Sequence, residues 1–358
     1  MKTTHNIYFK NSSDMCELDS NSIDLMITSP PYPMIEMWDF LFSSLNDEIK
    51  QALKEDDGKK ALTLMHKELE NVWDEVTRVL KPGGIACIDI GDATRKIGEN
   101  FQLFPNHVKI TNYFQNNDFI ELPCILWRKP TNSPNKFLGS GMLPPNAYVT
   151  LEHEYILIFR KGGIKRNLKP KSRNRYNSAF FWEERNKWFS DLWEDIRGTS
   201  QTLIKNNDDH KKLRERSAAY PIELPYRLIN MFSLYEDTVL DPFWGTGTTS
   251  LAAMISGRNS IGYDINVEFM EIFKKNLTEI KQLNLDTNNK RINQHIDFIK
   301  KYRNHFKEIK YNSIQYKFPV VTKQETNLLL YSIKSYSENR TEFIITYEEF
   351  KFDNELDF

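Results

Sequence analysis

One stretch of the chain constrains its fold more than any other: DTVLDPFWGTGTTSLAAMISGRNSIGYDIN, residues 237–266. A short apolar segment leads into a loop with two glycines, then into a helix-like run of small residues, then into a second apolar segment that ends at Asp264. Strand, tight loop, helix and strand within about 30 residues are typical of a βαβ unit. The unit predicts a parallel pair of strands and therefore an α/β protein.

Strand-like and helix-like segments alternate over the rest of the chain. Residues 60–80 place apolar side chains at intervals of three and four, as an amphipathic helix does, and KPGG at 81–84 is expected to end that helix. Residues 221–233 form a second predicted helix, and the predicted strands are 23–28, 85–91, 119–130 and 152–162. This alternation predicts a doubly wound, Rossmann-like sheet.

The composition excludes several classes of protein. A hydrophobic content of 40% and a charged content of 27% fit a globular protein. No apolar run approaches the roughly 20 residues of a membrane span, and the start MKTTHNIYFK lacks the features of a signal peptide. Cys16, Cys87 and Cys124 are far apart and odd in number, which argues against a disulfide framework or a zinc cluster. We expect a cytoplasmic protein with no metal site.

The glycine loop suits a ligand that carries a carboxylate and a ribose. Gly245 and Gly247 allow a tight turn and a close approach of the backbone, and the helix start beyond them offers N–H groups. Asp264 stands where an acid can hold ribose hydroxyls. Ser250 replaces the third glycine of a dinucleotide fingerprint, and no lysine follows the glycines as in a P-loop. S-adenosylmethionine has a ribose without a pyrophosphate and fits this pattern, while a structural turn is the alternative.

A second unusual stretch is SIDLMITSPPYPMIEMW, residues 22–38. An apolar segment ends abruptly in Ser29-Pro30-Pro31-Tyr32. Prolines commonly end a strand, so the tetrapeptide by itself is explained by a turn. Its position after a predicted buried strand also suits an active-site loop.

Read together, TSPPYP and LDPFWGTGTT resemble the amino-methylating DNA methyltransferases, in which one strand ends in Asp/Asn/Ser-Pro-Pro-aromatic and another in a Phe-x-Gly-x-Gly loop. The resemblance covers residues 6–275 and includes RVLKPGG, ILWRKP, EYILIFRKG, YPIELPYRLI and GRNSIGYDIN. The tetrapeptide precedes the cofactor loop, an order that resembles the β group of this family. Trp244 departs from the pattern, because the residue before the first glycine is often small.

The resemblance implies a site for each partner. The implied catalytic residues are Ser29, Pro30, Pro31 and Tyr32. The implied contacts to S-adenosylmethionine are Asp241, Phe243, Gly245, Thr246, Gly247, Thr248, Thr249, Asp264 and Pro221. The implied contacts to double-stranded DNA are Lys165, Arg166, Lys169, Lys171, Arg173 and Arg175, which lie in a window from Tyr155 to Trp182 without any acidic residue.

The implied reaction is methyl transfer to an exocyclic amine, whose lone pair is delocalised into the base and is a poor nucleophile. The Ser29 hydroxyl and the Pro30 carbonyl can accept hydrogen bonds from the amine and favour a localised lone pair. Tyr32 can stack on a base that has been flipped out of the duplex. Direct attack on the sulfonium methyl group needs no covalent intermediate, and alignment supplies much of the rate gain.

Serine at the first position of the tetrapeptide favours cytosine N4 as the target, because aspartate is commoner in the adenine-N6 enzymes of the family. Adenine N6 in DNA, an RNA or protein amine, and a non-catalytic DNA- or cofactor-binding role are the alternatives. Carbon-5 methylation would need a thiolate nucleophile. Pro123-Cys124 superficially matches such a site, but it lies in a strand-like run, so we expect Cys124 to be buried and structural.

The resemblance, together with a change in composition after about residue 280, implies a division of the chain. We expect a catalytic half at 1–160, a target-recognition region at 161–215, a cofactor-binding half at 216–280 and a C-terminal extension at 281–358. The extension is either a small domain or a set of packing elements. A cognate restriction endonuclease is a possible partner, the enzyme is expected to be a monomer or a homodimer, and DNA would hold it at the nucleoid.

Overall fold

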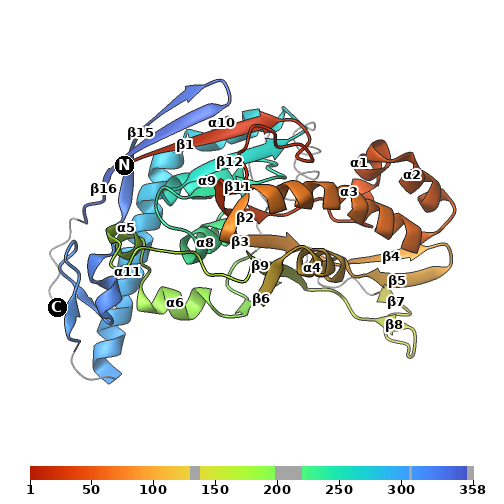
Figure 1. Ribbon diagram of the computed structural model, residues 1–358. Coiled ribbons are helices and arrows are strands. Elements are labelled where there is room, and N and C mark those ends of the chain that lie inside the picture. The colour runs from red at the N-terminus through yellow and green to blue at the C-terminus, as the bar shows by residue number, and fades with distance from the viewer. Residues whose placement is uncertain (130–137, 198–219, 306–308, 353–358) are drawn as a thin grey trace.

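A mixed β-sheet crosses the whole molecule and is covered by helices on both faces (Figure 1). The computed structural model describes residues 1–129, 138–197, 220–305 and 309–352. Within these residues ten strands form the main sheet, in the order β10-β6-β9-β3-β2-β11-β12-β1-β16-β15. In chain order they are β1 Lys2–Phe9, β2 Ile23–Thr28, β3 Leu80–Ile90, β6 Phe119–Arg128, β9 His153–Lys161, β10 Leu192–Trp193, β11 Thr238–Asp241, β12 Asn259–Asp264, β15 Tyr331–Asn339 and β16 Glu342–Glu349.

Short hairpins and helices complete the described part of the chain. The hairpins pair β4 Ala93–Ile97 with β5 Asn100–Phe104, β7 Leu138–Gly139 with β8 Ala147–Tyr148, and β13 Tyr311–Asn312 with β14 Pro319–Val320. The helices are η1 Glu36–Trp38, α1 Asp39–Leu45, α2 Asp47–Lys54, α3 Gly58–Val79, α4 Asn106–Asn116, α5 Arg173–Asn177, α6 Trp182–Trp188, α8 Glu223–Phe232, α9 Thr248–Ile255, α10 Phe269–Leu277, α11 Ile280–His305 and η2 Lys323–Asn327.

The strand β2 shows why the fold is doubly wound. All six of its residues are buried, as expected of a parallel strand covered on both faces. Leu25 and Ile27 belong to the core that includes α8 and α9, whereas Met26 between them belongs to the core that includes α3 and α4. Because successive side chains of a strand point to opposite faces, one apolar run supplies both cores. The predicted α/β doubly wound fold is confirmed.

The predicted elements match the structure closely, with one correction. β2 has the predicted bounds, and the predicted helix at 60–80 is α3, which begins after an N-cap by Asp57. The helix ends at KPGG as predicted, because α3 stops at Val79, but the next strand begins at Leu80 rather than at residue 85, so Lys81–Gly84 already belong to β3. The strand can absorb these residues because its pairing with β2 is irregular there, and Gly83 takes a positive φ of 79°.

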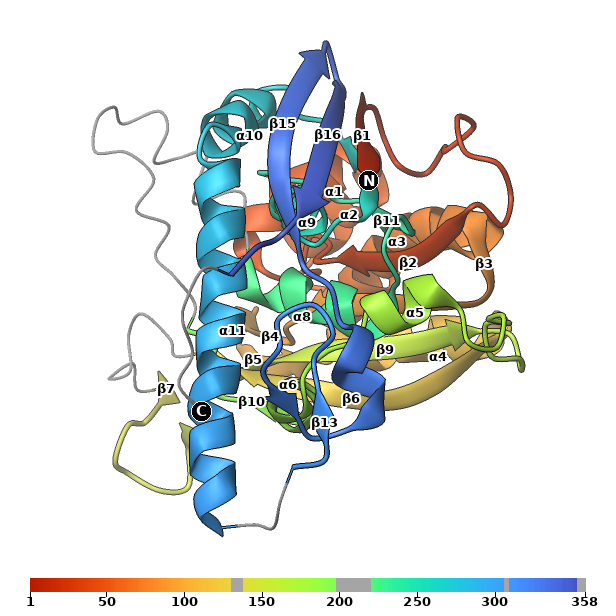
Figure 2. The same ribbon diagram turned by 90° about the vertical axis from the view of Figure 1, so that its left-hand side faces the viewer.

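The C-terminal extension is a set of packing elements. The hairpin β15–β16 pairs antiparallel with β1 and lengthens the main sheet, and α11 runs down its side (Figure 2). Arg291 of α11 is buried and its guanidinium bonds Glu184 of α6 at 2.6 and 2.8 Å. The extension therefore braces the sheet and α6. None of the described helices combines the length and the apolarity that a bilayer span requires.

Candidate active site

The two sequence motifs meet at one edge of the sheet. β2, β11 and β12 are parallel neighbours, so their carboxyl ends lie side by side. Ser29 follows the end of β2, the glycine loop follows β11, and Asp264 ends β12. The hydroxyl of Thr28 donates to Oδ1 of Asp241 at 2.7 Å, which joins the two strand ends although they are 213 residues apart in the chain. We call this the carboxyl edge.

The tetrapeptide is held rigidly at this edge. Pro30 and Pro31 are buried, and Ser29 and Tyr32 are half-buried. The amide of Asn106, at the start of α4, donates to the carbonyls of Pro33 and Gly91 at 3.0 Å each. These two hydrogen bonds fix the chain just after the tetrapeptide and leave Ser29 at the end of β2.

The Tyr32 side chain is held in place by contacts with Ser29, Glu154 and Gly91. Its hydroxyl accepts from the Ser29 hydroxyl at 3.1 Å and donates to Oε2 of Glu154 at 3.3 Å. The ring packs so closely on Gly91 that a Cβ there would lie 3.0 Å from Cε2 of Tyr32. Burial, reinforced by the negative charges of Asp89 and Glu154, raises the pKa of Tyr32 well above its usual value. Tyr32 is therefore a neutral phenol at physiological pH.

The glycine loop needs its two glycines for different reasons. Gly247 has φ +79°, and a Cβ there would lie 2.4 Å from Cδ2 of Phe273 and 2.7 Å from Cζ2 of Trp244. Gly245 has φ +53°, and the nearest atom to a Cβ there is the Phe243 carbonyl oxygen at 4.0 Å. Gly247 is required by packing, whereas the open space at Gly245 leaves its backbone accessible to a ligand.

Two unusual residues of the glycine loop, Trp244 and Ser250, are explained by one contact. Trp244 is buried and its ring lies over Gly262, where a Cβ would meet Cδ1 at 2.2 Å. Its indole N–H donates to the Ser250 hydroxyl at 2.9 Å. Ser250 occupies the position of the third glycine in a dinucleotide fingerprint, so the large residue before the first glycine and the serine after the second form one packing unit.

The Asp241 carboxylate supports the glycine loop through hydrogen bonds. It is buried, and Oδ2 accepts from the Thr249 hydroxyl at 2.5 Å, while the Tyr220 hydroxyl hydrogen-bonds with Thr249 and reaches Asp241 at 3.4 Å. Burial raises the pKa of Asp241 above its usual value, although the hydrogen bonds from Thr249 and Thr28 oppose the shift. Of the other predicted cofactor residues, Thr246 is buried, whereas Phe243, Thr248 and Pro221 are half-buried around the loop.

Asp264 faces the loop across the strand ends. Oδ2 accepts from the Gly245 N–H at 2.7 Å and Oδ1 accepts from the Asn266 N–H at 2.8 Å. Burial raises the pKa of Asp264 to about 6, although the hydrogen bonds from Asn266 and Gly245 oppose the shift. The side chain is half-buried, so its remaining lone pairs can accept hydrogen bonds from a ligand. A half-buried acid beside an accessible glycine backbone fits a ribose-bearing cofactor.

The six basic residues predicted to bind DNA lie elsewhere. Arg166 forms ion pairs with Asp237 and Asp24, at the beginning of β11 and β2. Its segment follows Lys161, the last residue of the antiparallel strand β9, so it lies at the amino ends of the parallel strands. We call this the amino edge; at about 3.3 Å per residue, β2 separates it from Ser29 by about 20 Å. The structure does not bring these residues together with the tetrapeptide.

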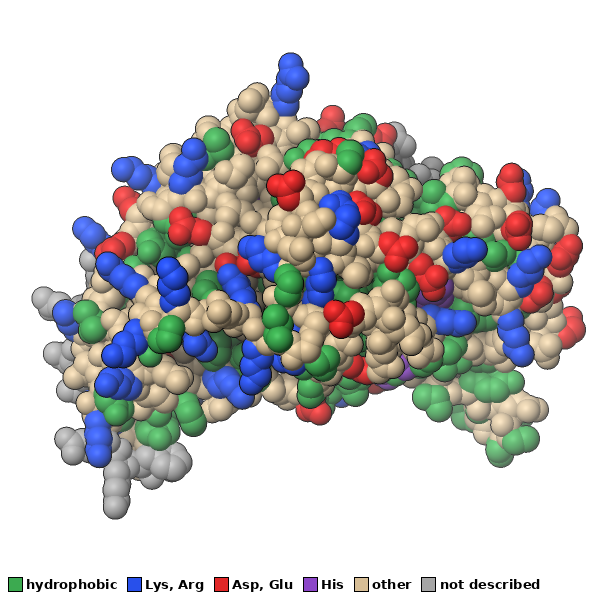
Figure 3. All heavy atoms as spheres, in the orientation of Figure 1, with side chains coloured by type: hydrophobic (Ala, Val, Ile, Leu, Met, Phe, Trp, Pro, Cys, Tyr) green, Lys and Arg blue, Asp and Glu red, His purple; other side chains and the backbone are tan. Residues whose placement is uncertain are grey.

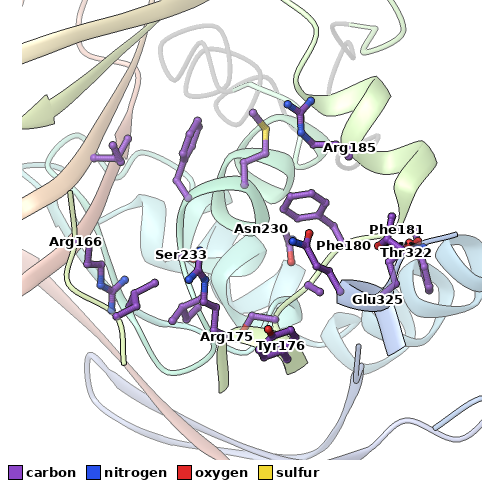
Figure 4. Close-up of a pocket in the computed structure, with 18 of the residues that line it drawn as sticks. Arg166, Arg175, Tyr176, Phe180, Phe181, Arg185, Asn230, Ser233, Thr322 and Glu325 are labelled. Atoms are coloured by element: carbon purple, nitrogen blue, oxygen red, sulfur yellow. Dashed lines mark hydrogen bonds between the residues drawn. The ribbon is translucent and has the colours of Figure 1, made fainter. Parts of the chain in front are cut away.

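The amino edge has a cavity of about 680 Å³ lined by cations and aromatic rings. Figure 4 shows Arg166, Arg175, Tyr176, Phe180 and Arg185 around it. Figure 3 shows Lys and Arg side chains gathered over this part of the surface, where α5 and α6 lie in Figure 1. Arg166 is held by its two acids, whereas Lys165, Lys169, Lys171, Arg173 and Arg175 are exposed. Residues 198–215 of the predicted recognition region lie outside the described residues.

Several residues of the site were not predicted from the sequence. Asp89 and Glu154 lie behind Tyr32, and Thr28 joins the two motifs. A signal existed for Asp89, since a charged residue inside the apolar run IACIDIG has to be buried in a strand. Cys124 is half-buried in β6 rather than buried as predicted, because alternate residues of that strand point away from the core.

Comparisons with known proteins show the family to which the chain is similar. The N6_N4_Mtase family, described as DNA methylase, matches residues 23–275. The chain is 54% identical over 352 residues to the Type II methyltransferase M.MthZI of Methanothermobacter thermautotrophicus, covering 98% of this chain and 96% of that protein. It is 52% identical over 304 residues to the Type II methyltransferase M.MjaI of Methanocaldococcus jannaschii, covering 82% and 97%.

Solved structures share the fold. A DNA modification methylase of Thermus thermophilus, TTHA0409, solved in complex with S-adenosyl-L-methionine, superposes with a TM-score of 0.59 at 29% identity, covering 77% of this chain and 94% of that one. The cytosine-N4-specific PvuII DNA methyltransferase has a TM-score of 0.52 at 19% identity, covering 79% and 94%. The family match and the two relatives decide the assignment: the chain belongs to the N6_N4_Mtase family of DNA methylases.

Proposed function

We propose that the protein transfers a methyl group from S-adenosylmethionine to the exocyclic N4 amine of a flipped-out cytosine in duplex DNA. The observation that carries the proposal is the junction of the two motifs: Ser29 and the glycine loop end neighbouring parallel strands and are joined by the hydrogen bond between Thr28 and Asp241. An acceptor for an amine and a half-buried acid for a ribose thus lie at one edge.

The chain's own residues account for the binding of both reactants. Asp264 would accept hydrogen bonds from the ribose hydroxyls of the cofactor, and the loop at Gly245 would receive its methionine end near the start of α9. The bound cofactor supplies an electrophilic methyl group, to which the amine nitrogen bonds as the C–S bond breaks and S-adenosylhomocysteine leaves. Ser29 and the Pro30 carbonyl orient the amine, and Tyr32 supports the base.

Serine supports cytosine as the target. The Ser29 hydroxyl donates to Tyr32 and so turns its lone pairs towards the open edge, where a neutral acceptor can bind an amine without a negative charge. The same acceptor can serve adenine N6, which is the alternative target. The Type II methyltransferases M.MthZI and M.MjaI support a place in a restriction–modification system with a cognate endonuclease.

One assay tests the target. The protein is incubated with labelled S-adenosylmethionine and mixed-sequence duplex DNA, and the nucleosides are identified by mass after digestion. N4-methylcytosine is the expected product. N6-methyladenine would move the proposal to the alternative target, and transfer only to RNA or protein would overturn the DNA substrate.

The exposed cations of the amino edge are a separate part of the proposal. Lys165, Lys169, Lys171, Arg173 and Arg175 would contact phosphates that flank the target, which requires the duplex to continue past the amino edge. Arg166 is already paired with two acids and would lose those pairs on binding a phosphate.

A further inference from the structure

We propose that Glu154 is a positioning residue that ends a proton path from Ser29 through Tyr32. This inference rests on the proposed methyl transfer, and it adds where the proton of the amine goes. The path consists of two hydrogen bonds in series, Ser29 to Tyr32 at 3.1 Å and Tyr32 to Oε2 of Glu154 at 3.3 Å.

The direction of proton transfer along the path follows from its last residue, Glu154. A carboxylate can only accept, so the Tyr32 proton points to Glu154, and the Tyr32 oxygen is left to accept the Ser29 proton. The Ser29 oxygen then has no proton towards the open edge and can accept from an amine. Glu154 thereby makes a neutral serine an obligatory acceptor, which answers how serine can replace a carboxylate in the tetrapeptide.

Glu154 is itself fixed by its surroundings. Its side chain is only 13% exposed, and Oε1 accepts from Nζ of Lys129 at 2.9 Å. Asp89 of the neighbouring strand β3 is buried beside it, and burial together with the charge of Glu154 raises the pKa of Asp89 well above its usual value. The Lys129 ammonium offsets the negative charge of this acidic pair.

The proton balance of the reaction fits this path. Bond formation between the amine nitrogen and the methyl carbon leaves the nitrogen with a positive charge and one proton too many. As that proton moves to the Ser29 oxygen, the Ser29 proton moves to the Tyr32 oxygen and the Tyr32 proton moves to Glu154. Glu154 becomes a neutral carboxylic acid and later releases the proton to water, so the amine loses one proton and solvent gains it.

The test compares Glu154→Gln with Glu152→Gln. Glu152 lies two residues before Glu154 in the chain, is 56% exposed and pairs with Arg128, so it controls for the loss of one negative charge. We expect Glu154→Gln to lower kcat by roughly 10²-fold, with KM for DNA and for the cofactor unchanged, and Glu152→Gln to leave all three unchanged. A wild-type kcat for Glu154→Gln, or a loss confined to KM, would overturn the proposal.

A second variant keeps the test independent of folding. Tyr32→Phe keeps the ring and interrupts the path, so it is expected to lower kcat by a similar factor, and Glu154→Gln in that background should add no further loss. The solvent deuterium isotope effect on the wild-type methyl-transfer step should vanish in Tyr32→Phe. If the two losses are additive, or if the isotope effect persists in Tyr32→Phe, Glu154 has only a structural role in its ion pair with Lys129.

The outcomes also separate this inference from the proposed function. The path serves any exocyclic amine, so N6-methyladenine as the wild-type product would overturn the cytosine assignment and leave the comparison of variants valid. Full activity without the Glu154 charge would overturn the path and leave the cytosine assignment standing.

Discussion

The two edges of the central sheet carry opposite kinds of chemistry. At the carboxyl edge the side chains are hydroxyls and half-buried or buried acids, held by hydrogen bonds such as Thr28 to Asp241 and Tyr32 to Glu154. At the amino edge they are exposed cations and aromatic rings around a cavity. The carboxyl edge presents positioned acceptors, as a reaction at an amine requires, and the amino edge presents solvated charges, which suit phosphates.

The difference has a cause in the topology. Parallel strands bring loops from distant parts of the chain to their carboxyl ends, so Ser29 and Asp264 meet there. The cations of the amino edge come from one contiguous segment that starts where β9 ends. A site that needs several precise acceptors is therefore assembled by the fold, whereas a basic surface needs only a local run of sequence.

The largest expected effects are those of Ser29 and Tyr32 variants, at the carboxyl edge. Ser29→Ala removes an oriented acceptor and is expected to lower kcat by roughly 10²- to 10³-fold, with cofactor affinity unchanged because the cofactor loop belongs to β11. Single-turnover methyl transfer and calorimetric cofactor binding measure the two quantities. Ser44→Ala, at an exposed site on α1, is the control. A full rate in Ser29→Ala would show that the Pro30 carbonyl suffices.

A second prediction separates Tyr32 from the cofactor loop. Tyr32→Ala removes both the stacking surface and the hydroxyl and is expected to abolish methyl transfer while cofactor binding survives. The same two measurements apply. An equal loss of cofactor affinity would mean that Tyr32 lies in the cofactor site.

The glycine loop offers a prediction on stability. Gly247→Ala combines a strained φ with clashes against Phe273 and Trp244, and is expected to lower the free energy of unfolding by about 2–4 kcal/mol. Gly245→Ala has no such clash and should cost about 1 kcal/mol, while it weakens cofactor binding by filling the open space. Urea denaturation with cofactor titration distinguishes them, and equal stabilities would contradict the packing.

We expect cofactor binding to depend on pH through the Asp264 carboxylate. Its pKa of about 6 means that the carboxylate is progressively protonated below that pH, so cofactor affinity should fall by up to about tenfold per pH unit there. For folding the sign is opposite: a raised pKa contributes stability below the ordinary value of 3.8, and this is lost as the pH rises through about 6. Asp264→Asn should bind weakly and show neither dependence, and an unchanged pH profile would place the ribose elsewhere.

The smallest effect is expected at the amino edge. The double variant Lys171→Gln, Arg175→Gln removes two exposed cations and should weaken binding to all DNA sequences alike, with kcat unchanged. The slope of log affinity against log salt should decrease by about 0.9 for each lost phosphate contact. An unchanged slope would confine the duplex to the carboxyl edge.

Much of the fold could be predicted because its signals are local. The buried run IDLMIT, the three-and-four spacing of α3 and the unit at 237–266 each specify one element through its own periodicity. The exception is the start of β3: KPGG ends the helix as predicted, but Leu80 and Ile85 on either side of it both pair with β2, so these four residues form an irregularity within the strand rather than a loop before it. Tertiary pairing overrode the local preference.

By itself the sequence determined the α/β class, the positions of Ser29 and Asp264, and the resemblance to a family, because these follow from residue types at short spacing. Only the tertiary structure decided that Glu154 lies behind Tyr32, that Trp244 packs onto Ser250, and that the basic window lies on the edge away from Ser29. The physical reason is that strand order and direction set which distant segments meet, and no single segment of the chain encodes them.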